Sequence, residues 1–264
     1  MSNDSIGKTL GVAFGLCLIC SVVVSTTAVK LRPEQTANKV MDKRKNILQA
    51  AGLLEEGKSV EELFRQIEPK LIDLSTGEYL DEDPQNFDAR KAAKDSKENW
   101  TIPAERDFAG IKTRAQKAPV YLLKNEGKLE GVILPVSGKG LWSTLYGFLA
   151  LSSDTNTVKG LSFYEHGETP GLGGEVENPK WKALWPGKKV YNENGEVVLH
   201  LTKGSVETGT PGSEFKVDGL SGATLTSRGV SQILKFWLGP DGFKPFLEKL
   251  RANQTDLAEV KIYE

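Results

Sequence analysis

Cysteine and histidine are scarce in this chain. Of its 264 residues only Cys17 and Cys20 are cysteines, and only His166 and His200 are histidines. Both cysteines lie in an apolar run near the N-terminus, so the sequence from residue 21 onward contains no thiol. This excludes a disulfide framework, a cysteine-ligated zinc site and a cysteine-ligated iron–sulfur cluster there. Two imidazoles also argue against a multi-histidine metal site, and we expect no metal centre.

An excess of charge of either sign is also lacking. The 34 Lys and Arg residues nearly balance the 35 Asp and Glu residues, and the formal net charge is −1. A protein that binds nucleic acid through bulk charge needs clustered basic residues, so we predict no nucleic-acid partner. The hydrophobic share of 39% and the charged share of 26% exclude a disordered chain, a collagen and a polytopic membrane protein. The length permits one large or two small domains.

An uncharged apolar run spans residues 10–29, between Lys8 and Lys30. As a helix it would be ~30 Å long, which is the thickness of the hydrocarbon layer of a bilayer. The sequence therefore predicts a single membrane-spanning helix over residues 9–29, after a cytoplasmic tail of residues 1–8. Two alternatives are a cleaved signal peptide, which usually has a shorter apolar region and a better cleavage site than Thr26-Thr27-Ala28, and a buried core helix.

Basic residues are more numerous after the apolar run than before it. Only Lys8 precedes the run, whereas six basic residues follow it closely: Lys30, Arg32, Lys39, Lys43, Arg44 and Lys45. This count alone would place the downstream part of the chain in the cytoplasm, although the rule weakens for long translocated domains.

Residues 30–118 are predicted to form a helical stalk and a membrane-proximal region. A helix over residues 33–51 ends at Gly52 and either stands alone or continues the membrane helix. The capping box Ser59-Val60-Glu61-Glu62 opens a short helix that reaches about residue 67. A strand follows over residues 71–74, and the highly charged residues 81–117 are expected to form a surface excursion with some helix.

From residue 119 to residue 264 the sequence changes to strands, turns and two final helices. Strands are expected over residues 120–123, 129–136, 141–151, 158–165, 190–191 and 196–202, with a hairpin turn at 125–128. Residues 171–185 are expected to be part loop and part helix, and helices are expected over 225–238 and 241–252. The fold class predicted is α+β, with an antiparallel sheet and helices packed on it.

Two segments carry the chemistry, and the first is rich in glycine. It reads His-Gly-Glu-Thr-Pro-Gly-Leu-Gly-Gly-Glu over residues 166–175. Glycines allow a backbone to approach a ligand closely and to adopt positive φ. The segment matches neither a Walker loop nor a dinucleotide fingerprint, and a turn-rich connection without a ligand is the alternative.

The second segment reads Asp-Gly-Leu-Ser-Gly-Ala-Thr-Leu-Thr-Ser over residues 218–227 and leads into a helix with an apolar face. Its hydroxyl residues either cap that helix or hold an anion at its N-terminus. A nucleophilic Ser221 with His166 or His200 fits poorly, because the last glycine of G-x-S-x-G is absent and no histidine follows the serine.

The motif Asp-Gly-Leu-Ser-Gly-Ala-Thr fits the flavinylation pattern Asp-x-x-Ser/Thr-Gly-Ala-Thr. With the upstream Glu-Thr-Pro-Gly-Leu-Gly and one N-terminal span, the chain resembles the covalent FMN-binding proteins that include the C subunit of sodium-translocating NADH:quinone oxidoreductases and the G subunit of Rnf complexes. Val-Glu-Asn-Pro at 176–179 and Trp-Leu-Gly-Pro at 237–240 favour the former. The resemblance implies an electron-carrying subunit, not the NADH-oxidising site, of a bacterial inner-membrane complex that oxidises NADH, reduces ubiquinone and pumps sodium.

Three alternatives remain open: an Rnf-type ferredoxin:NAD oxidoreductase subunit, a membrane-tethered hydrolase and a non-redox assembly module. The resemblance also implies partners, namely the other subunits of the complex and a flavin transferase that uses FAD and magnesium. It places the soluble domain, residues 119–264, in the periplasm, against the count of basic residues.

The resemblance implies that FMN is joined through its phosphate to Thr224, and that the recognition pattern is completed by Asp218, Ser221, Gly222 and Ala223. Five residues match the family's segment near the flavin ring: Glu168, Thr169, Gly171, Leu172 and Gly173. Trp142 and Tyr146 are predicted as further ring neighbours, or else as core residues, and Lys203 as a cation for the flavin or its phosphate, or else as a solvated charge. We expect the Glu168 carboxylate to lie beside the ring and tune its potential, or else to cap a turn and face solvent.

Overall fold

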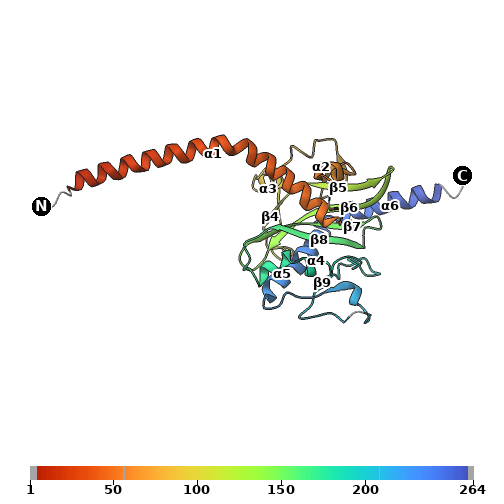
Figure 1. Cartoon of the computed structure of the whole chain (residues 1–264). Coiled ribbons are helices and arrows are strands. Elements are labelled where there is room, and N and C mark those ends of the chain that lie inside the picture. The colour runs from red at the N-terminus through yellow and green to blue at the C-terminus, as the bar shows by residue number, and fades with distance from the viewer. Residues whose placement is uncertain (1–4, 56, 208, 261–264) are drawn as a thin grey trace. The chain divides into compact units, whose positions relative to one another are not determined.

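The computed structural model describes residues 5–55, 57–207 and 209–260, and for residues 254–260 it describes the backbone alone. The chain divides into two compact units, Met1–Arg44 and Lys45–Glu264. Helix α1 (Ile6–Ala50) begins in the first unit and ends in the second (Figure 1).

The first unit consists of helix α1 up to residue 44. Its apolar stretch is exposed along its length, and it is long and apolar enough to cross a membrane. None of that stretch is buried, which removes the interpretation as a core helix. Pro33 lies inside α1, so the helix predicted over 33–51 is a continuation of the apolar helix. The predicted stop at Gly52 is confirmed, because this residue has a φ of +70° just beyond the last helical residue.

The second unit is built on a six-stranded sheet in which every neighbouring pair is antiparallel. The strand order is β2-β1-β5-β6-β7-β8. The strands are β1 (Ile67–Asp73), β2 (Tyr79–Leu80), β5 (Lys117–Asn125), β6 (Lys128–Lys139), β7 (Thr144–Ser152) and β8 (Val158–Glu165). The predicted α+β fold, an antiparallel sheet with packed helices, is confirmed.

Both faces of this sheet are covered, as the alternation along β7 shows. Leu145 and Leu149 belong to a large core together with Ile233 of helix α5 (Thr224–Trp237). Phe148 belongs to a second core with Leu48 from the last turn of α1. In Figure 1 α4 (Pro179–Lys182) and α5 lie on one side of the sheet, and α2 (Val60–Phe64) lies on the other. Helix α6 (Lys244–Val260) contributes buried phenylalanine and leucine side chains to the larger core.

Local signals in the sequence set several turns and caps. The hydroxyl of Ser59 accepts a hydrogen bond from Glu62 N, as the predicted capping box requires. Glu126 and Gly127 both have positive φ, 49° and 79°, between β5 and β6, which is the backbone of a two-residue hairpin turn.

The predicted boundary between residues 118 and 119 needs correction. It falls inside β5, and β1 pairs with β5 over seven residue pairs. The compact unit begins at Lys45, so residues 67–117 belong to the sheet domain and its surface. This part of the chain also contains the short elements α3 (Ala89–Ala92), β3 (Asn99–Thr101) and β4 (Thr113–Ala115).

Short elements also follow β8. These are the 3-10 helices η1 (Gly173–Glu177) and η2 (Ser213–Phe215) and the parallel pair β9 (His200–Leu201) and β10 (Lys216–Val217).

Candidate functional site

The motif at residues 218–227 crosses the start of helix α5. Gly222 has a φ of +70°, a conformation that L side chains rarely adopt, and it turns the chain into the helix. Ala223 is the N-cap residue and makes no side-chain bond to the helix, so the first amide groups of α5 are left without a side-chain cap. Thr224 is the first helical residue, and its side chain is exposed.

The two hydroxyls that follow Thr224 are buried and engaged. Thr226 Oγ1 donates to Glu168 Oε2 at 2.6 Å. Ser227 Oγ donates to the carbonyl of Ala223 at 3.1 Å and accepts from Leu220 N at 2.9 Å. In the part of the chain that the structure describes, no such bond holds the Thr224 hydroxyl. Thr224 is therefore the helical hydroxyl of the motif that a ligand can reach.

Asp218 anchors the beginning of the motif. Its Oδ1 accepts from Val206 N at 2.8 Å, and its carbonyl accepts from Trp181 Nε1 at 3.0 Å. Lys203 is exposed and lies in the adjoining segment, because Gly219 N donates to the carbonyl of Gly204 at 3.2 Å. Lys203 thus flanks the first residues of the motif.

The glycine-rich segment folds back on the same helix start. The carbonyl of Thr169 accepts from Leu172 N and from Gly174 N, which closes a tight turn in which Gly171 has a φ of +76°. The tip of this turn touches the motif, because a Cβ on Gly222 would lie 2.9 Å from Leu172 Cδ2. Thr169, Gly171 and Leu172 are exposed, whereas Gly173 is buried.

The Glu168 carboxylate is buried, with 5% of the residue exposed. It accepts hydrogen bonds from Thr226 and from the amides of Leu141, Trp142 and Ser143. Burial alone would raise its pKa, but these four donors outweigh burial and hold the pKa of Glu168 below its ordinary value. The expectation of a solvent-facing turn cap is contradicted, since this carboxylate points into the protein.

Four large apolar side chains remain exposed around the start of α5. Trp142 is 70% exposed, Leu225 is 55% exposed, and Leu141 and Leu172 are each about 40% exposed. The alternative of core packing for Trp142 is therefore wrong. An exposed apolar patch beside an accessible hydroxyl is typical of a ligand surface.

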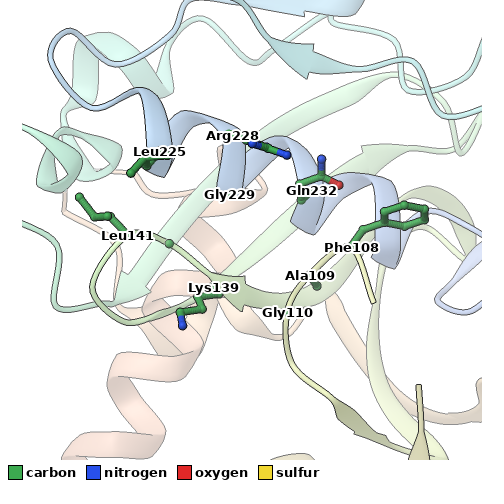
Figure 2. Close-up of a pocket in the computed structure, with 10 residues that line it drawn as sticks. Phe108, Ala109, Gly110, Lys139, Leu141, Leu225, Arg228, Gly229 and Gln232 are labelled. Carbon is green, nitrogen blue, oxygen red and sulfur yellow. The ribbon is translucent and has the colours of Figure 1, made fainter. Parts of the chain in front are cut away.

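An open pocket of about 240 Å³ adjoins this patch (Figure 2). It lies between α5 and the segments at 108–110 and 139–141, and Leu141 and Leu225 stand at one end of it. The sequence analysis missed four side chains that line it, namely Phe108, Lys139, Arg228 and Gln232. Arg228 could have been found, because it follows Thr224 by four residues on a predicted helix.

Tyr146 is the predicted ring neighbour that the structure does not bring to this patch. It lies on β7 in alternation with Leu145, on the same face as Phe148 and the end of α1, which is the face away from α5. The guanidinium of Arg90 covers its ring at 3.5 Å from the centroid. Arg90 is held there by two hydrogen bonds to the Glu165 carboxylate.

Neither histidine forms a pair with Ser221 among the described residues. His166 Nδ1 accepts from Glu168 N at 3.2 Å, and its Nε2 lies 3.1 Å from Glu177 Oε1. His200 is exposed, and its Nδ1 lies 2.8 Å from the carbonyl of Val198. The structure thus gives the hydrolase alternative no nucleophile and base in contact. Within the described residues no group of three or more His, Cys, Asp or Glu side chains could hold a metal ion.

Comparison with known proteins assigns the class of this domain. The FMN-binding domain family matches residues 140–239, which include the exposed patch, the glycine-rich segment and the flavinylation motif. The fold agrees with this class: the crystal structure of Shewanella oneidensis NqrC is 40% identical, has a TM-score of 0.76, and covers 82% of this chain and 99% of that one. The C subunit of the Na(+)-translocating NADH-quinone reductase from Parabacteroides distasonis, at 30% identity and a TM-score of 0.64, covers 82% and 96%.

Longer matches define the family. The C subunit of the Na(+)-translocating NADH-quinone reductase of Vibrio vulnificus is 54% identical over 251 residues, which cover 95% of this chain and 97% of the relative. Its counterpart from Pseudomonas aeruginosa is 51% identical over 259 residues, covering 96% and 99%. The chain belongs to the NqrC family, the C subunits of the sodium-translocating NADH-quinone reductases, as the motif predicts. It is therefore part of an oxidoreductase complex, and the apolar helix α1 fits membrane anchoring.

Proposed function

We propose that this chain carries FMN bound covalently through a phosphoester to Thr224, and that it passes electrons within a complex that oxidises NADH, reduces ubiquinone and pumps sodium. The observation that carries the proposal is the difference between the three hydroxyls that the motif places on helix α5. Thr224 is exposed at an uncapped helix start, whereas Thr226 and Ser227 are buried and hydrogen-bonded.

The residues present fit such a group. A phosphate on Thr224 would lie at the N-terminus of a 14-residue helix, where the free amides and the helix dipole favour negative charge. Arg228 and Lys139 line the adjoining pocket and add two cations near that helix start. Bound FMN supplies one- and two-electron redox chemistry, and the protein's part is to hold and orient it.

The exposed apolar side chains of Leu141, Trp142, Leu172 and Leu225 would form the surface on which the flavin ring rests. We call these four residues the flavin seat. Covering aromatic and branched aliphatic side chains with a flat ring removes apolar surface from water. This burial favours binding by roughly 25 cal/mol per Å² of apolar surface. Thr169 and Gly171 form the turn that presents Leu172.

We propose that a second protein makes the attachment to Thr224. A flavin transferase would join Thr224 Oγ1 to the phosphorus of the FMN half of FAD. The hydroxyl proton leaves, the bond to the AMP half breaks, and AMP is released. The exposed Ser221 and Gly222 lie at the surface that such an enzyme would approach.

The test is peptide mapping of the full chain made together with a flavin transferase. Tryptic cleavage after Lys216 and Arg228 yields residues 217–228, which contain all the competing hydroxyls. Fragmentation should place the flavin mass on Thr224. Thr224→Ala should abolish covalent flavin completely, and Thr224→Ser, which keeps a hydroxyl, should retain part of it. Flavin found on Ser221 or Thr226 in the wild type would refute the assignment.

A further inference from the structure

The Glu168 carboxylate joins three segments that are distant in sequence. It belongs to the glycine-rich segment, and its two oxygens accept from the amides of the turn between β6 and β7. Those distances are 3.1 Å from Leu141 N, 3.0 Å from Trp142 N and 3.2 Å from Ser143 N. The fourth donor, Thr226 Oγ1, lies on the first turn of α5.

The carboxylate of Glu168 packs so closely against the backbone of Gly140 and Gly173 that neither position has space for a side chain. A Cβ on Gly140 would lie 2.6 Å from Glu168 Oε1, and a Cβ on Gly173 would lie 2.8 Å from Glu168 Oε2 and 2.6 Å from Thr226 Oγ1. Such separations are too short for carbon and oxygen atoms, so both glycines are required by the packing of Glu168. The glycine-rich segment is thus explained in part by a contact inside the protein.

The charge of Glu168 is satisfied by hydrogen bonds and not by an ion pair. Among the described residues no lysine or arginine lies within salt-bridge distance of it. Backbone amides have fixed directions, so three of them converging on two oxygens fix the turn that carries them. That turn presents two residues of the flavin seat, Leu141 and Trp142, while the segment of Glu168 itself presents Leu172.

We propose that Glu168 is a positioning residue that assembles the flavin seat before the cofactor is attached. Its carboxylate ties the turn bearing Leu141 and Trp142 to the first turn of α5, beside Thr224. The inference rests on the proposed function for the identity of the ligand, whereas the tie is made by side chains and amides of this chain alone. Glu168 therefore acts on the flavin through the position of the seat, and it does not contact the ring as a tuning charge.

The first measurement uses the full chain in detergent, made without flavin transferase so that Thr224 is free. Hydrogen exchange followed by mass spectrometry reports on the amides of residues 141–143. In Glu168→Gln, whose amide group replaces one acceptor oxygen by a donor, we expect those amides to exchange at least tenfold faster. The amides of Val132, Ile133 and Leu134 in β6 serve as an internal reference and should keep the wild-type rate.

Two further variants keep the test decisive. Glu165→Gln changes an exposed glutamate nearby, whose carboxylate binds Arg90, and it should leave residues 141–143 at the wild-type rate. Thr226→Val retains the shape of the side chain but removes the bond to the carboxylate. It should speed exchange at the amide of Ser227, which donates to the carbonyl of Ala223, while residues 141–143 stay protected. Wild-type exchange of residues 141–143 in a folded Glu168→Gln protein would overturn the proposal.

The second measurement uses the flavinylated chain. Glu168→Gln should still carry flavin on Thr224, but the flavin should show lower fluorescence anisotropy and at least twofold stronger quenching by iodide. Unchanged flavin signals together with faster exchange at residues 141–143 would show that the tie is structural only and would overturn the positioning role. If the wild type acquires no flavin, the proposed function fails, and the exchange measurement still decides whether the tie exists.

Discussion

Thr224 and Thr226 are separated by one residue, but their hydroxyls have different surroundings because the two side chains project from different sides of helix α5. Successive helical residues are rotated by ~100°, so Thr224 and Thr226 point to nearly opposite sides of α5. One meets solvent beside an apolar surface, and the other meets the buried carboxylate of Glu168. The fold thus leaves the hydroxyl of Thr224 accessible and buries that of Thr226.

A second carboxylate in the sheet domain offers a test by pH. Asp154 closes the turn between β7 and β8, accepting from Asn156 N at 3.0 Å and Thr157 N at 2.8 Å. Burial opposes its ionisation, but the Thr157 hydroxyl, these amides and Lys189 lower the pKa of Asp154 to about 2. Since the folded pKa lies below the ordinary value of 3.8, the ionised form stabilises the fold above pH ~4. That contribution is lost as the pH falls towards 2.

Asp154→Asn should therefore lower the stability of the chain at pH 7 by about 1 kcal/mol, a value reduced for the exposure of the side chain. The difference from the wild type should shrink below pH ~4 and be small near pH 2, where Asp154 is about half protonated in the folded state. Thermal unfolding followed by circular dichroism between pH 2 and pH 7 measures it. Asp81→Asn, at an exposed aspartate, is the control and should change the Tm little. A difference that grows in acid would contradict the assignment.

At the residue scale the sequence predicted the helix start that carries Thr224 but not the contacts of Glu168. The motif residues are contiguous, so their positions at a helix start follow from local signals. The contacts of Glu168 join residues 25 to 58 positions apart, and no local pattern encodes them. The same holds for Tyr146, because the pattern of β7 alone does not say which face of the sheet meets α5. The prediction that Glu168 lies beside the ring rested on the resemblance alone.

At the scale of elements, helix α5 lies close against strand β6. A Cβ on Gly138 of β6 would lie 2.4 Å from Ile233 Cγ1, and a Cβ on Gly229 of α5 would lie 2.5 Å from the carbonyl of Lys139. Both contacts need the absence of a side chain, one on each element. The position of α5, and with it that of Thr224, relative to β6 depends on this close approach.

Gly229→Ala should destabilise the protein, although replacing glycine by alanine usually stabilises a helix. In an open helix, alanine is favoured over glycine by about 1 kcal/mol. Here the new methyl group meets backbone atoms that cannot move without shifting β6, so we expect a loss of about 1–3 kcal/mol. Urea unfolding followed by circular dichroism measures it. Arg228→Ala, an exposed neighbour on the same helix, should change the stability by less than about 0.5 kcal/mol. A more stable Gly229→Ala protein would show that α5 packs less closely.

Local sequence patterns predict most helices, strands and turns of the sheet domain, but they do not predict which strands pair with one another. The capping box at Ser59, the turn at Glu126 and Gly127 and the helix of the flavinylation motif were all predicted within a few residues. The pairing of β1 with β5 joins residues about fifty positions apart. The charged residues between the two strands give no local signal that the strands are paired. That is why the domain boundary was placed too late.

At the scale of the whole molecule, an apolar helix precedes a sheet domain, and the side of the membrane on which that domain lies is open to test. The count of basic residues after the apolar run predicts the cytoplasm, whereas the resemblance implies the periplasm. A domain of this length is translocated largely regardless of nearby charges, so we propose the periplasmic side. The N-terminal residues would then lie in the cytoplasm.

The distribution of cysteine makes this proposal measurable. Replacing Cys17 and Cys20 by alanine leaves no thiol in the chain, so a single new cysteine labels one place. Ser205 lies at an exposed position in the sheet domain, and Ser5 lies at an exposed position before the apolar helix. With a membrane-impermeant maleimide on intact spheroplasts, Ser205→Cys should be labelled at once. Ser5→Cys should be labelled only after detergent is added. The reverse pattern would place the domain in the cytoplasm, and a flavin on Thr224 would then have to serve partners on that side.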